Sequence, residues 1–486
     1  MRDLVRQHLR FFLLATAAGL LLRLVFVFRF PGITNDSLVY GDLAKNWLQH
    51  GVYGLTSQHD IIPVDIRLPG YPAFLALVFS IFGMEHYRAA LVIQVIVDLG
   101  TCFVIADLAR RLISPRAAKT AFLLVALCPF LADYSAAALT ETLEIFFTAA
   151  ALDAVIAGLT RADKISPWTI AGLSTAAAIL LRPDGGLILA AVGFYLGWLM
   201  LRRIHASRDR TGEDSQPWKR GPSGPGKMQQ KLRALAPAQL AKAGAILTFV
   251  TLAPLVPWTL RNLRTMHQFQ PLAPRYANQP GEFVSMGFNR WVKTWIADFS
   301  STEDTYWVVP GDNIDPNALP NRAFDSAQQR EQTLQLIADY NQTQAIDAPL
   351  DARFAQLADD RIHAHPLRYY VELPLLRIAD MWLRPRTEKL PSDTRWWHFD
   401  DDPRWLALAL ALGAINLFYV GAALVGWIRN FVNPILQPHH QLLVLFVLMR
   451  SLFLGTLENP EARYTLECYP VVIVFAAVFL SRRRPL

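Results

Sequence analysis

The chain contains ten apolar segments, separated by charged residues or by Pro and Gly. A helix needs about 20 predominantly apolar residues to cross a bilayer, and several of these segments reach that length. Only 18% of the residues are charged and 53% are hydrophobic, which argues against an ordinary soluble protein. The sequence therefore predicts an all-α polytopic membrane protein with about ten transmembrane helices. We place them at residues 11–29, 87–109, 117–132, 140–160, 167–181, 185–201, 239–258, 404–428, 441–456 and 467–481.

The loops between these segments alternate in charge. If the N-terminus is cytoplasmic, the ten crossings place every basic cluster on the cytoplasmic side, as the positive-inside rule requires. Residues 31–68 and 262–403, where acidic residues outnumber basic ones, then fall on the opposite side. We expect a multi-pass protein of the cell inner (cytoplasmic) membrane with both termini in the cytoplasm. The basic clusters are Arg110–Lys119, Arg161–Lys164, residues 202–242, Arg429 and Arg482–Arg484.

Three regions follow from this topology. Residues 1–261 form an N-terminal transmembrane core, which includes the first external loop (31–72) and a basic cytoplasmic loop (202–242). Residues 262–403 form an extracytoplasmic domain of mixed secondary structure, and residues 404–486 hold the last transmembrane helices. No small-residue cleavage site follows the first apolar segment, so we expect that segment to remain as an uncleaved span.

The first external loop holds the strongest candidate for chemistry. Apolar residues at helical spacing from Tyr40 to Leu48 predict a helix that lies on the membrane surface. Asp36 stands at the N-terminal end of this helix, just beyond the first span. Its carboxylate is a candidate general base, a role that contributes typically ~10²–10⁴-fold to a rate. The alternative is structural, because Asn35-Asp36-Ser37 before a helix is a good N-capping sequence.

Polar residues at the outer ends of other spans form a second candidate set. Glu141 begins the fourth span, where it is either a functional acid or a carboxylate placed favourably in the helix dipole; Asp133 is a second choice for the same role. Three arginines also fall on the outer side, against the positive-inside trend. Arginine binds phosphate through paired charge-assisted hydrogen bonds, while interfacial anchoring or ion pairing is the structural alternative. These arginines are Arg182, Arg261 and Arg463.

Several of these motifs resemble the GT-C membrane glycosyltransferases, and in particular the bacterial relatives of the protein O-mannosyltransferases and the lipid A aminoarabinose transferase. The similarity covers the N-terminal half of the chain best, and then about the last 30 residues. Its motifs are Asp36, Tyr40, Gly51-Val52-Tyr53-Gly54 and Arg67-Leu68-Pro69-Gly70-Tyr71-Pro72 in the first loop, the P-W-x-x-R-N segment from Pro257 to Asn262, and the E-x-R-Y segment Glu461-Ala462-Arg463-Tyr464.

The resemblance implies a GT-C fold and the transfer of one sugar from a polyprenyl-phosphate carrier, with inversion at the anomeric carbon. It implies Asp36 as the catalytic base, with Glu141 supporting it or positioning the acceptor. The remaining roles are donor-phosphate binding by Arg182, Arg261, Arg463 and Tyr464, and substrate positioning by Tyr40, Arg67 and Tyr71.

No cofactor is predicted from the sequence, and a divalent metal stays open. His363 and His365, with Asp359 and Asp360 nearby, match no zinc-binding spacing. No nucleotide-binding motif is found, which is consistent with a lipid-bound donor. The expected partners are the lipid bilayer, a polyprenyl-phosphate sugar donor and a lipid, glycan or protein acceptor, with no nucleic acid.

Two other functions remain as alternatives. A membrane transporter or flippase of lipid-linked sugars would carry ionisable residues near the middle of several spans, and here Arg23, Asp98 and Asp153 are the charges inside apolar segments. A polysaccharide polymerase or ligase is the alternative among enzymes. The sequence favours an integral membrane glycosyltransferase, either a hexosyl- or a pentosyltransferase, that acts on the outer face of the membrane.

Overall fold

The computed structural model describes residues 1–58, 60–160, 164–213, 236–278, 281–396, 402–432 and 439–481. Most of the predicted basic loop 202–242 and all of Arg482–Arg484 lie outside this part of the chain. The chain forms two compact units. The first unit comprises residues 1–273, 422–447 and 468–486, and the second comprises residues 274–421 and 448–467.

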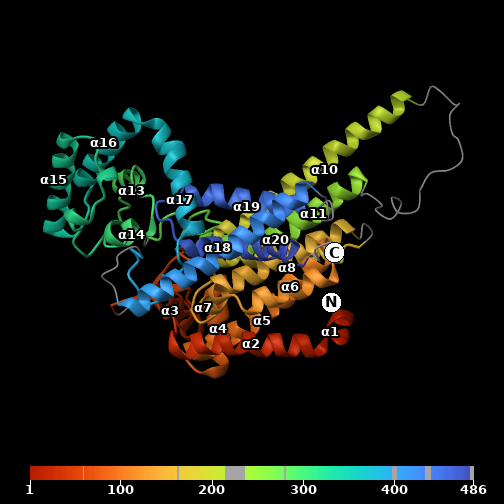
Figure 1. The fold of residues 1–486 in the computed structure, drawn as a ribbon. Helices are drawn as coiled ribbons and strands as arrows, with labels where there is room; N and C mark the ends of the chain where they lie inside the picture. Colours follow the sequence, from red (N-terminus) through yellow and green to blue (C-terminus); the bar gives the residue numbers. More distant parts are fainter. Residues whose placement is uncertain are drawn as a thin grey trace, which may run out of the picture. The chain divides into compact units, whose positions relative to one another are not determined.

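The first unit is a bundle of helices with one short hairpin, strands β1 and β2, in the first loop (Figure 1). Its elements are α1 (Arg2–Gln7), α2 (Leu9–Arg29), α3 (Asn35–His50), β1 (Gly54–Ser57), β2 (Asp60–Pro63), α4 (Gly70–Phe82), α5 (Tyr87–Leu112), α6 (Pro115–Ala126), α7 (Pro129–Ser135), α8 (Glu141–Thr160), α9 (Ser166–Leu181), η1 (Pro183–Gly185), α10 (Gly186–Glu213), α11 (Pro237–Leu252), α12 (Leu255–Thr265) and α20 (Tyr469–Leu480), together with parts of α18 (Pro403–Val432) and α19 (His440–Gly455).

All ten predicted apolar segments form helices. Seven helices in the described part of the chain are long and apolar enough to cross a membrane, and the pair α6 and α7, bent by 53°, makes an eighth if it counts as one span. The segments predicted at 167–181 and 441–456 are the apolar helices α9 and α19, of 16 residues each. The prediction of an all-α polytopic membrane protein is confirmed.

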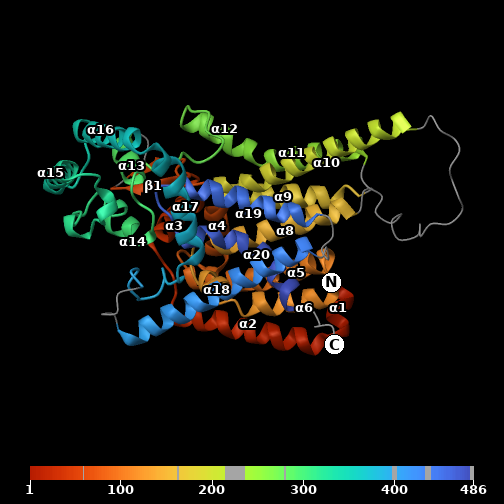
Figure 2. The same ribbon diagram turned by 45° about the horizontal axis from the view of Figure 1, so that its top comes forward.

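Helix α8 lies at the centre of the first unit. It packs against α5 and α9, and α5, α6 and α8 run side by side in both views (Figures 1 and 2). Small residues make this close packing possible: a Cβ added at Gly158 would come within 2.7 Å of the Trp168 ring. The first residue of α8 is Glu141, one of the predicted site residues.

The charge inside the first span is neutralised within the protein. Arg23 Nε donates to Asp98 Oδ2 at 2.7 Å, and Arg23 Nη1 donates to the carbonyl of Ala126 at 2.7 Å. Both charged side chains are fully buried, as a charge inside a membrane requires. The pair fastens α2 to α5 and to the C-terminal end of α6, just before the bend. The charges of Arg23 and Asp98 are thus neutralised within the helix bundle, as expected for a structural ion pair.

The regular secondary structure of the second unit is helical in the residues that the structure describes. Its elements are α13 (Met286–Lys293), α14 (Phe299–Ser301), η3 (Thr302–Tyr306), η4 (Pro316–Ala318), η5 (Asn321–Ala323), α15 (Ala327–Thr343), α16 (Ala348–Ala364), η6 (Arg368–Glu372), α17 (Leu373–Leu383), η7 (Ala462–Cys468) and the remaining parts of α18 and α19.

A core of large aromatic and aliphatic side chains holds the second unit together. Trp291 of α13 and Trp295, two residues beyond the end of α13, are fully buried in one core with Phe354 of α16 and Tyr340 of α15. The sequence predicts a domain of mixed secondary structure here, but the described residues 281–396 contain no strand. The apolar residues of this region follow helical spacing: α15 and α16, each started by a side-chain N-cap, bury their apolar faces in this core.

Candidate active site

Helix α3 places Asp36 at the start of the first external loop. The N-cap of α3 is Thr34, whose backbone N–H donates to Ser37 Oγ at 3.0 Å in a capping box. Asp36 is therefore inside the first helical turn, and the alternative prediction that it caps the helix is wrong. A carboxylate in this turn lies close to the positive end of the helix dipole.

Asp36 forms an ion pair with Arg67 from the other end of the same loop. Arg67 Nη2 donates to Asp36 Oδ1 at 2.9 Å, and the two side chains are 25% and 36% exposed. The guanidinium of Arg67 also lies over the ring of Tyr40, 5.9 Å from its centroid. A carboxylate that is oriented by a neighbour and still accessible has the geometry that a general base needs.

Tyr40 and Tyr71 form the buried side of this site. Their rings meet edge to face with centroids 5.1 Å apart, and Tyr71 OH donates to Gln94 Oε1 at 2.6 Å. Gln94 Nε2 in turn donates to the carbonyl of Ala137 at 2.6 Å. Burial raises the pKa of the Tyr40 hydroxyl to about 12, and the charges of the neighbouring acids and arginines act on it from close by. Tyr40 therefore keeps its proton at neutral pH.

Backbone contacts fix the loop that carries Asp36. Gly32, just before α3, donates to the carbonyl of Ala136 and accepts from the N–H of Ala138, both at 2.8 Å. At the other end of the loop, a Cβ added at Gly70 would lie 2.5 Å from the carbonyl oxygen of Leu180, so α4 approaches the end of α9 as closely as only glycine permits. These contacts join the Asp36 loop to the segment before α8 and to the C-terminal end of α9.

At those helix ends, Arg182 lies among three carboxylates. Its guanidinium is 3.7 Å from Glu141 Oε1, 3.7 Å from Glu144 Oε2 and 3.3 Å from Asp184 Oδ1. Glu141 and Glu144 are buried, whereas Arg182 is 20% exposed. The charges of Arg182 and Glu141 act on the pKa of Tyr40, as those of Asp36 and Arg67 do. Three carboxylates around one guanidinium leave Arg182 little spare positive charge for a phosphate.

Arg261 contacts the first loop from α12. Its guanidinium donates to the backbone carbonyls of Tyr53 and Val64, at 2.5 and 2.7 Å, and lies over the rings of Tyr53 and Trp258, 5.3 Å from each centroid. These bonds hold the residues that flank the hairpin β1–β2. A phosphate role for Arg261 stays a prediction, and its observed contacts stabilise the loop.

An apolar cavity of about 420 Å³ lies beside this contact. It is lined by side chains of α3, the hairpin, α9 and α12, and Arg261 is its charged residue. Among the lining residues are Trp47, Tyr53, Pro69, Leu180, Pro257 and Trp258.

The E-x-R-Y segment belongs to the second unit. Arg463 binds Glu461 with both ends of its guanidinium, Nε to Oε2 at 2.6 Å and Nη2 to Oε1 at 3.1 Å. Tyr464 OH donates to the same carboxylate, and the Arg463 guanidinium lies over the Tyr464 ring. Glu461 thereby fixes the orientation of both residues that the sequence assigns to the donor phosphate.

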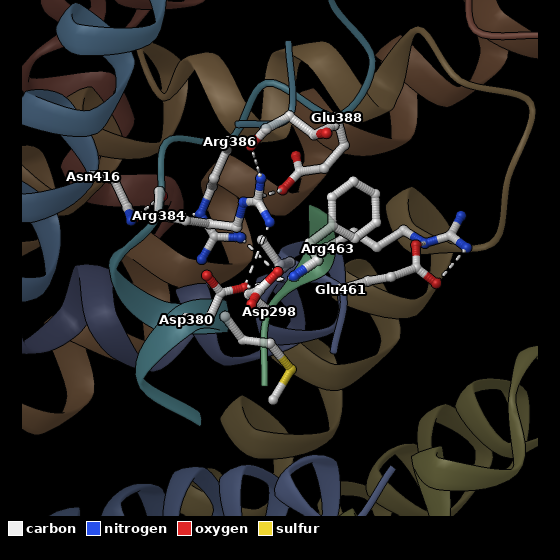
Figure 3. Close-up of polar contacts among 12 residues, drawn as sticks. Asp298, Asp380, Arg384, Arg386, Glu388, Asn416, Glu461 and Arg463 are labelled. Carbon is white, nitrogen blue, oxygen red and sulfur yellow. Dashed lines mark hydrogen bonds and ion pairs between the residues drawn. The ribbon is translucent and has the colours of Figure 1, made fainter. Parts of the chain in front are cut away.

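Buried arginines hold the backbone of this segment in place. Arg386 donates to the carbonyl of Ala462 and to Thr465 Oγ1, both at 2.6 Å, and Figure 3 shows it between Asn416 and the E-x-R-Y segment. Arg450 pairs with Glu467 at 3.0 Å. Both arginines are almost fully buried, so the segment is rigidly supported by charge-assisted hydrogen bonds.

Sequence reasoning missed Gln94, Glu144 and Asp184. A signal existed for each: Gln94 is a polar residue inside an apolar span, and Glu144 follows Glu141 by three residues on one face of α8. Asp184 is two residues from Arg182. No group of three His, Cys, Asp or Glu side chains in the described ranges has the geometry to hold a metal ion.

Residues 67–209 match the family model described as dolichyl-phosphate-mannose-protein mannosyltransferase. This segment runs from Arg67 through Tyr71, Glu141 and Arg182. The search of curated proteins found no match to this sequence.

Solved structures show a similar fold. The archaeal oligosaccharyltransferase AglB from Archaeoglobus fulgidus, solved with an inhibitory peptide and a dolichol-phosphate, aligns with a TM-score of 0.51 at 13% identity and covers 98% of this chain and 50% of its own. The same enzyme tethered to an acceptor peptide gives 0.51 at 14% identity, covering 98% and 49%. ArnT from Cupriavidus metallidurans bound to undecaprenyl phosphate gives 0.38 at 12% identity, covering 96% and 77%.

This chain thus spans about half the length of the archaeal enzyme. At such low sequence identity, the structural alignments support a similar fold and nothing more. The family model supports a sequence relationship over residues 67–209. Together with the membrane helices and the site geometry, these findings confirm the resemblance predicted from the motifs: the protein is similar to the GT-C membrane glycosyltransferases.

Proposed function

We propose that the protein is an integral membrane glycosyltransferase that moves one sugar from a polyprenyl-phosphate carrier to an acceptor on the outer face of the cytoplasmic membrane. The observation that carries this proposal is the accessible carboxylate of Asp36, oriented by Arg67 at 2.9 Å beside the buried Tyr40. The family model over residues 67–209, whose description names a dolichyl-phosphate mannose donor, supports a lipid-linked donor.

Asp36 acts as the general base in this mechanism. An acceptor hydroxyl or amine attacks the anomeric carbon, its proton passes to the Asp36 carboxylate, and the bond from the anomeric carbon to the carrier phosphate breaks with its electron pair leaving on the phosphate oxygen. Attack from the face opposite the phosphate inverts the anomeric carbon. Proton removal of this kind supplies roughly 10²–10⁴-fold in rate.

The neighbouring residues position the substrates. Arg67 orients Asp36, and Tyr40 offers a hydroxyl that stays protonated at neutral pH because burial raises its pKa to about 12. Glu141, held near Arg182, supports this side of the site. Arg182, Arg261, Arg463 and Tyr464 stay the candidates for the donor phosphate, and each arginine already has partners: carboxylates for Arg182 and Arg463, and backbone carbonyls for Arg261.

Intact-mass analysis of envelope lipids, glycans and proteins from a deletion strain tests the proposal. A loss of one hexose or pentose from one class of molecule, restored by the wild-type gene and not by an Asp36→Asn gene, is the expected result. An envelope in which every acceptor keeps its mass, or full restoration by the Asp36→Asn gene, would contradict it.

A further inference from the structure

A cluster of cations surrounds one carboxylate in the second unit, apart from the E-x-R-Y contacts. Three groups converge on Glu458 Oε1: Arg275 Nη2 at 2.6 Å, Tyr276 OH at 3.2 Å and Lys293 Nζ at 3.7 Å. Glu458 is buried, whereas Arg275 is 57% exposed and gives the cluster an opening to solvent. The residues come from the segment after α12, the last turn of α13 and the segment after α19.

The positive charge of this cluster exceeds its negative charge. Arg377 lies behind it and is 1% exposed, and its guanidinium donates to the backbone carbonyls of Lys293, Ile296 and Gly455. Among the residues that the structure describes, no carboxylate is within ion-pair distance of Arg377. Three cations therefore share the single charge of Glu458, although buried charges are normally paired.

The Lys293 ammonium has unused hydrogen-bonding capacity. Its side chain is 18% exposed, and in the described part of the chain Nζ donates no hydrogen bond of 3.5 Å or less. Its contacts are the ion pair with Glu458 at 3.7 Å and the ring of Tyr369, 6.0 Å from the centroid. Burial lowers the pKa of Lys293, and the charges of Arg275 and Arg377 lower it further, against the opposing effect of Glu458. An ammonium has three N–H donors, so Lys293 can donate hydrogen bonds to the oxygen atoms of a ligand.

We propose that Arg275, Tyr276 and Lys293 form an oxyanion-binding site that holds a phosphate or carboxylate group of the sugar acceptor. A guanidinium and an ammonium on either side of one opening bind such a group by charge-assisted hydrogen bonds, and the added anion balances the charge of Arg377. The assignment to the acceptor rests on the proposed glycosyltransferase function. The existence of the anion site rests on the cluster alone.

Protection of Lys293 from an amine-acetylating reagent tests the site in the purified full-length protein. Inorganic phosphate represents a phosphate-bearing acceptor and glucuronate a carboxylate-bearing one, with the acetylation rate of each lysine followed by peptide mass spectrometry. At least one of the two should slow acetylation of Lys293 several-fold while leaving Lys45 on α3 unchanged. The anion that protects at the lower concentration identifies the group.

Arg275→Gln and Arg290→Gln are matched variants. Both arginines are exposed, but Arg290 pairs with Asp359 and makes no contact with Glu458. Arg275→Gln should weaken protection about 10–100-fold, as expected for the loss of a charge-assisted hydrogen bond, and Arg290→Gln should leave it near wild type. Absence of protection by either anion, or equal protection in the Arg275→Gln protein, would overturn the site.

The acetylation assay needs no turnover, so it separates this inference from the proposed function. Sugar transfer in the complemented deletion strain should fall at least tenfold for Arg275→Gln relative to Arg290→Gln. Protection of Lys293 together with unchanged transfer would overturn the assignment to the acceptor. A different outcome is that the anions protect Lys293 in the purified protein while the envelope of the deletion strain keeps all its sugars. That outcome would count against the glycosyltransferase function and leave the anion site in place.

Discussion

Replacement of Asp36 by Asn should remove most of the sugar transfer and leave the fold intact. A base that contributes ~10²–10⁴-fold corresponds to about 2.7–5.5 kcal/mol of barrier, and Asn removes that contribution because an amide does not take the proton. The effect on stability should be small. Thr34, not Asp36, caps α3, and Asn keeps an oxygen for Arg67. The ion pair is partly exposed, and such pairs contribute roughly 0–1 kcal/mol.

The measurement compares initial rates of acceptor glycosylation in a deletion strain that carries each variant at equal membrane levels. The sugar-modified acceptor is quantified by mass spectrometry after induction. Thermal unfolding of the detergent-solubilised proteins reports the fold separately. The expected result is a rate at least 100-fold lower than wild type, at the lower bound for base catalysis, with an unfolding temperature within a few degrees of wild type.

Two control variants lie on the same helix. Asp42 accepts from the backbone N–H and hydroxyl of Thr56, so Asp42→Asn should lose about one hydrogen bond and keep most of the transfer. Thr34→Ala removes the N-cap hydroxyl and keeps the backbone bond to Ser37 Oγ, so stability should fall by at most about 1 kcal/mol, with little loss of transfer per folded molecule. Transfer by the Asp36→Asn protein at a rate close to that of Asp42→Asn would refute Asp36 as the base.

Three further predictions concern other parts of the chain. A cysteine introduced at position 330 should react with an impermeant reagent added from outside, and one at 215 should not; the reverse pattern would invert the proposed topology. Arg463→Lys keeps the charge but loses the paired contact with Glu461, so transfer should fall while membrane insertion stays normal, and wild-type transfer would remove Arg463 from the donor site. Burial raises the pKa of Asp380 from 3.8 to about 6, so its protonated form stabilises the fold at low pH and this contribution is lost as pH rises through 6. The free energy of unfolding of Asp380→Asn should match that of wild type near pH 4 and exceed it by up to about 3 kcal/mol near pH 7. A difference between the two proteins that does not change with pH would show that Asp380 does not titrate in this range.

Much of the fold was predictable because it depends on local pattern. A long apolar segment must form a helix in a bilayer, since every backbone hydrogen bond has to be made within the segment. The ten predicted segments are accordingly all helical, and the spacing of apolar residues after Asp36 correctly predicted α3. The alternative that placed the N-cap at Asp36 is two residues too late, because Thr34, Asp36 and Ser37 are all acceptable capping residues and the backbone conformation chooses among them.

The arrangement of the site needed the tertiary structure. The candidate acids and arginines could be chosen from the sequence, and so could the alternation of spans that brings the start of α8 near the end of α9. The sequence did not show that Arg182 would lie among three carboxylates, or that Arg261 would bond to carbonyls of the first loop about 200 residues earlier in the chain. Such contacts depend on which helix faces meet. Helical periodicity specifies an apolar face but not its partner, so the charge balance around each arginine is decided only when the helices pack.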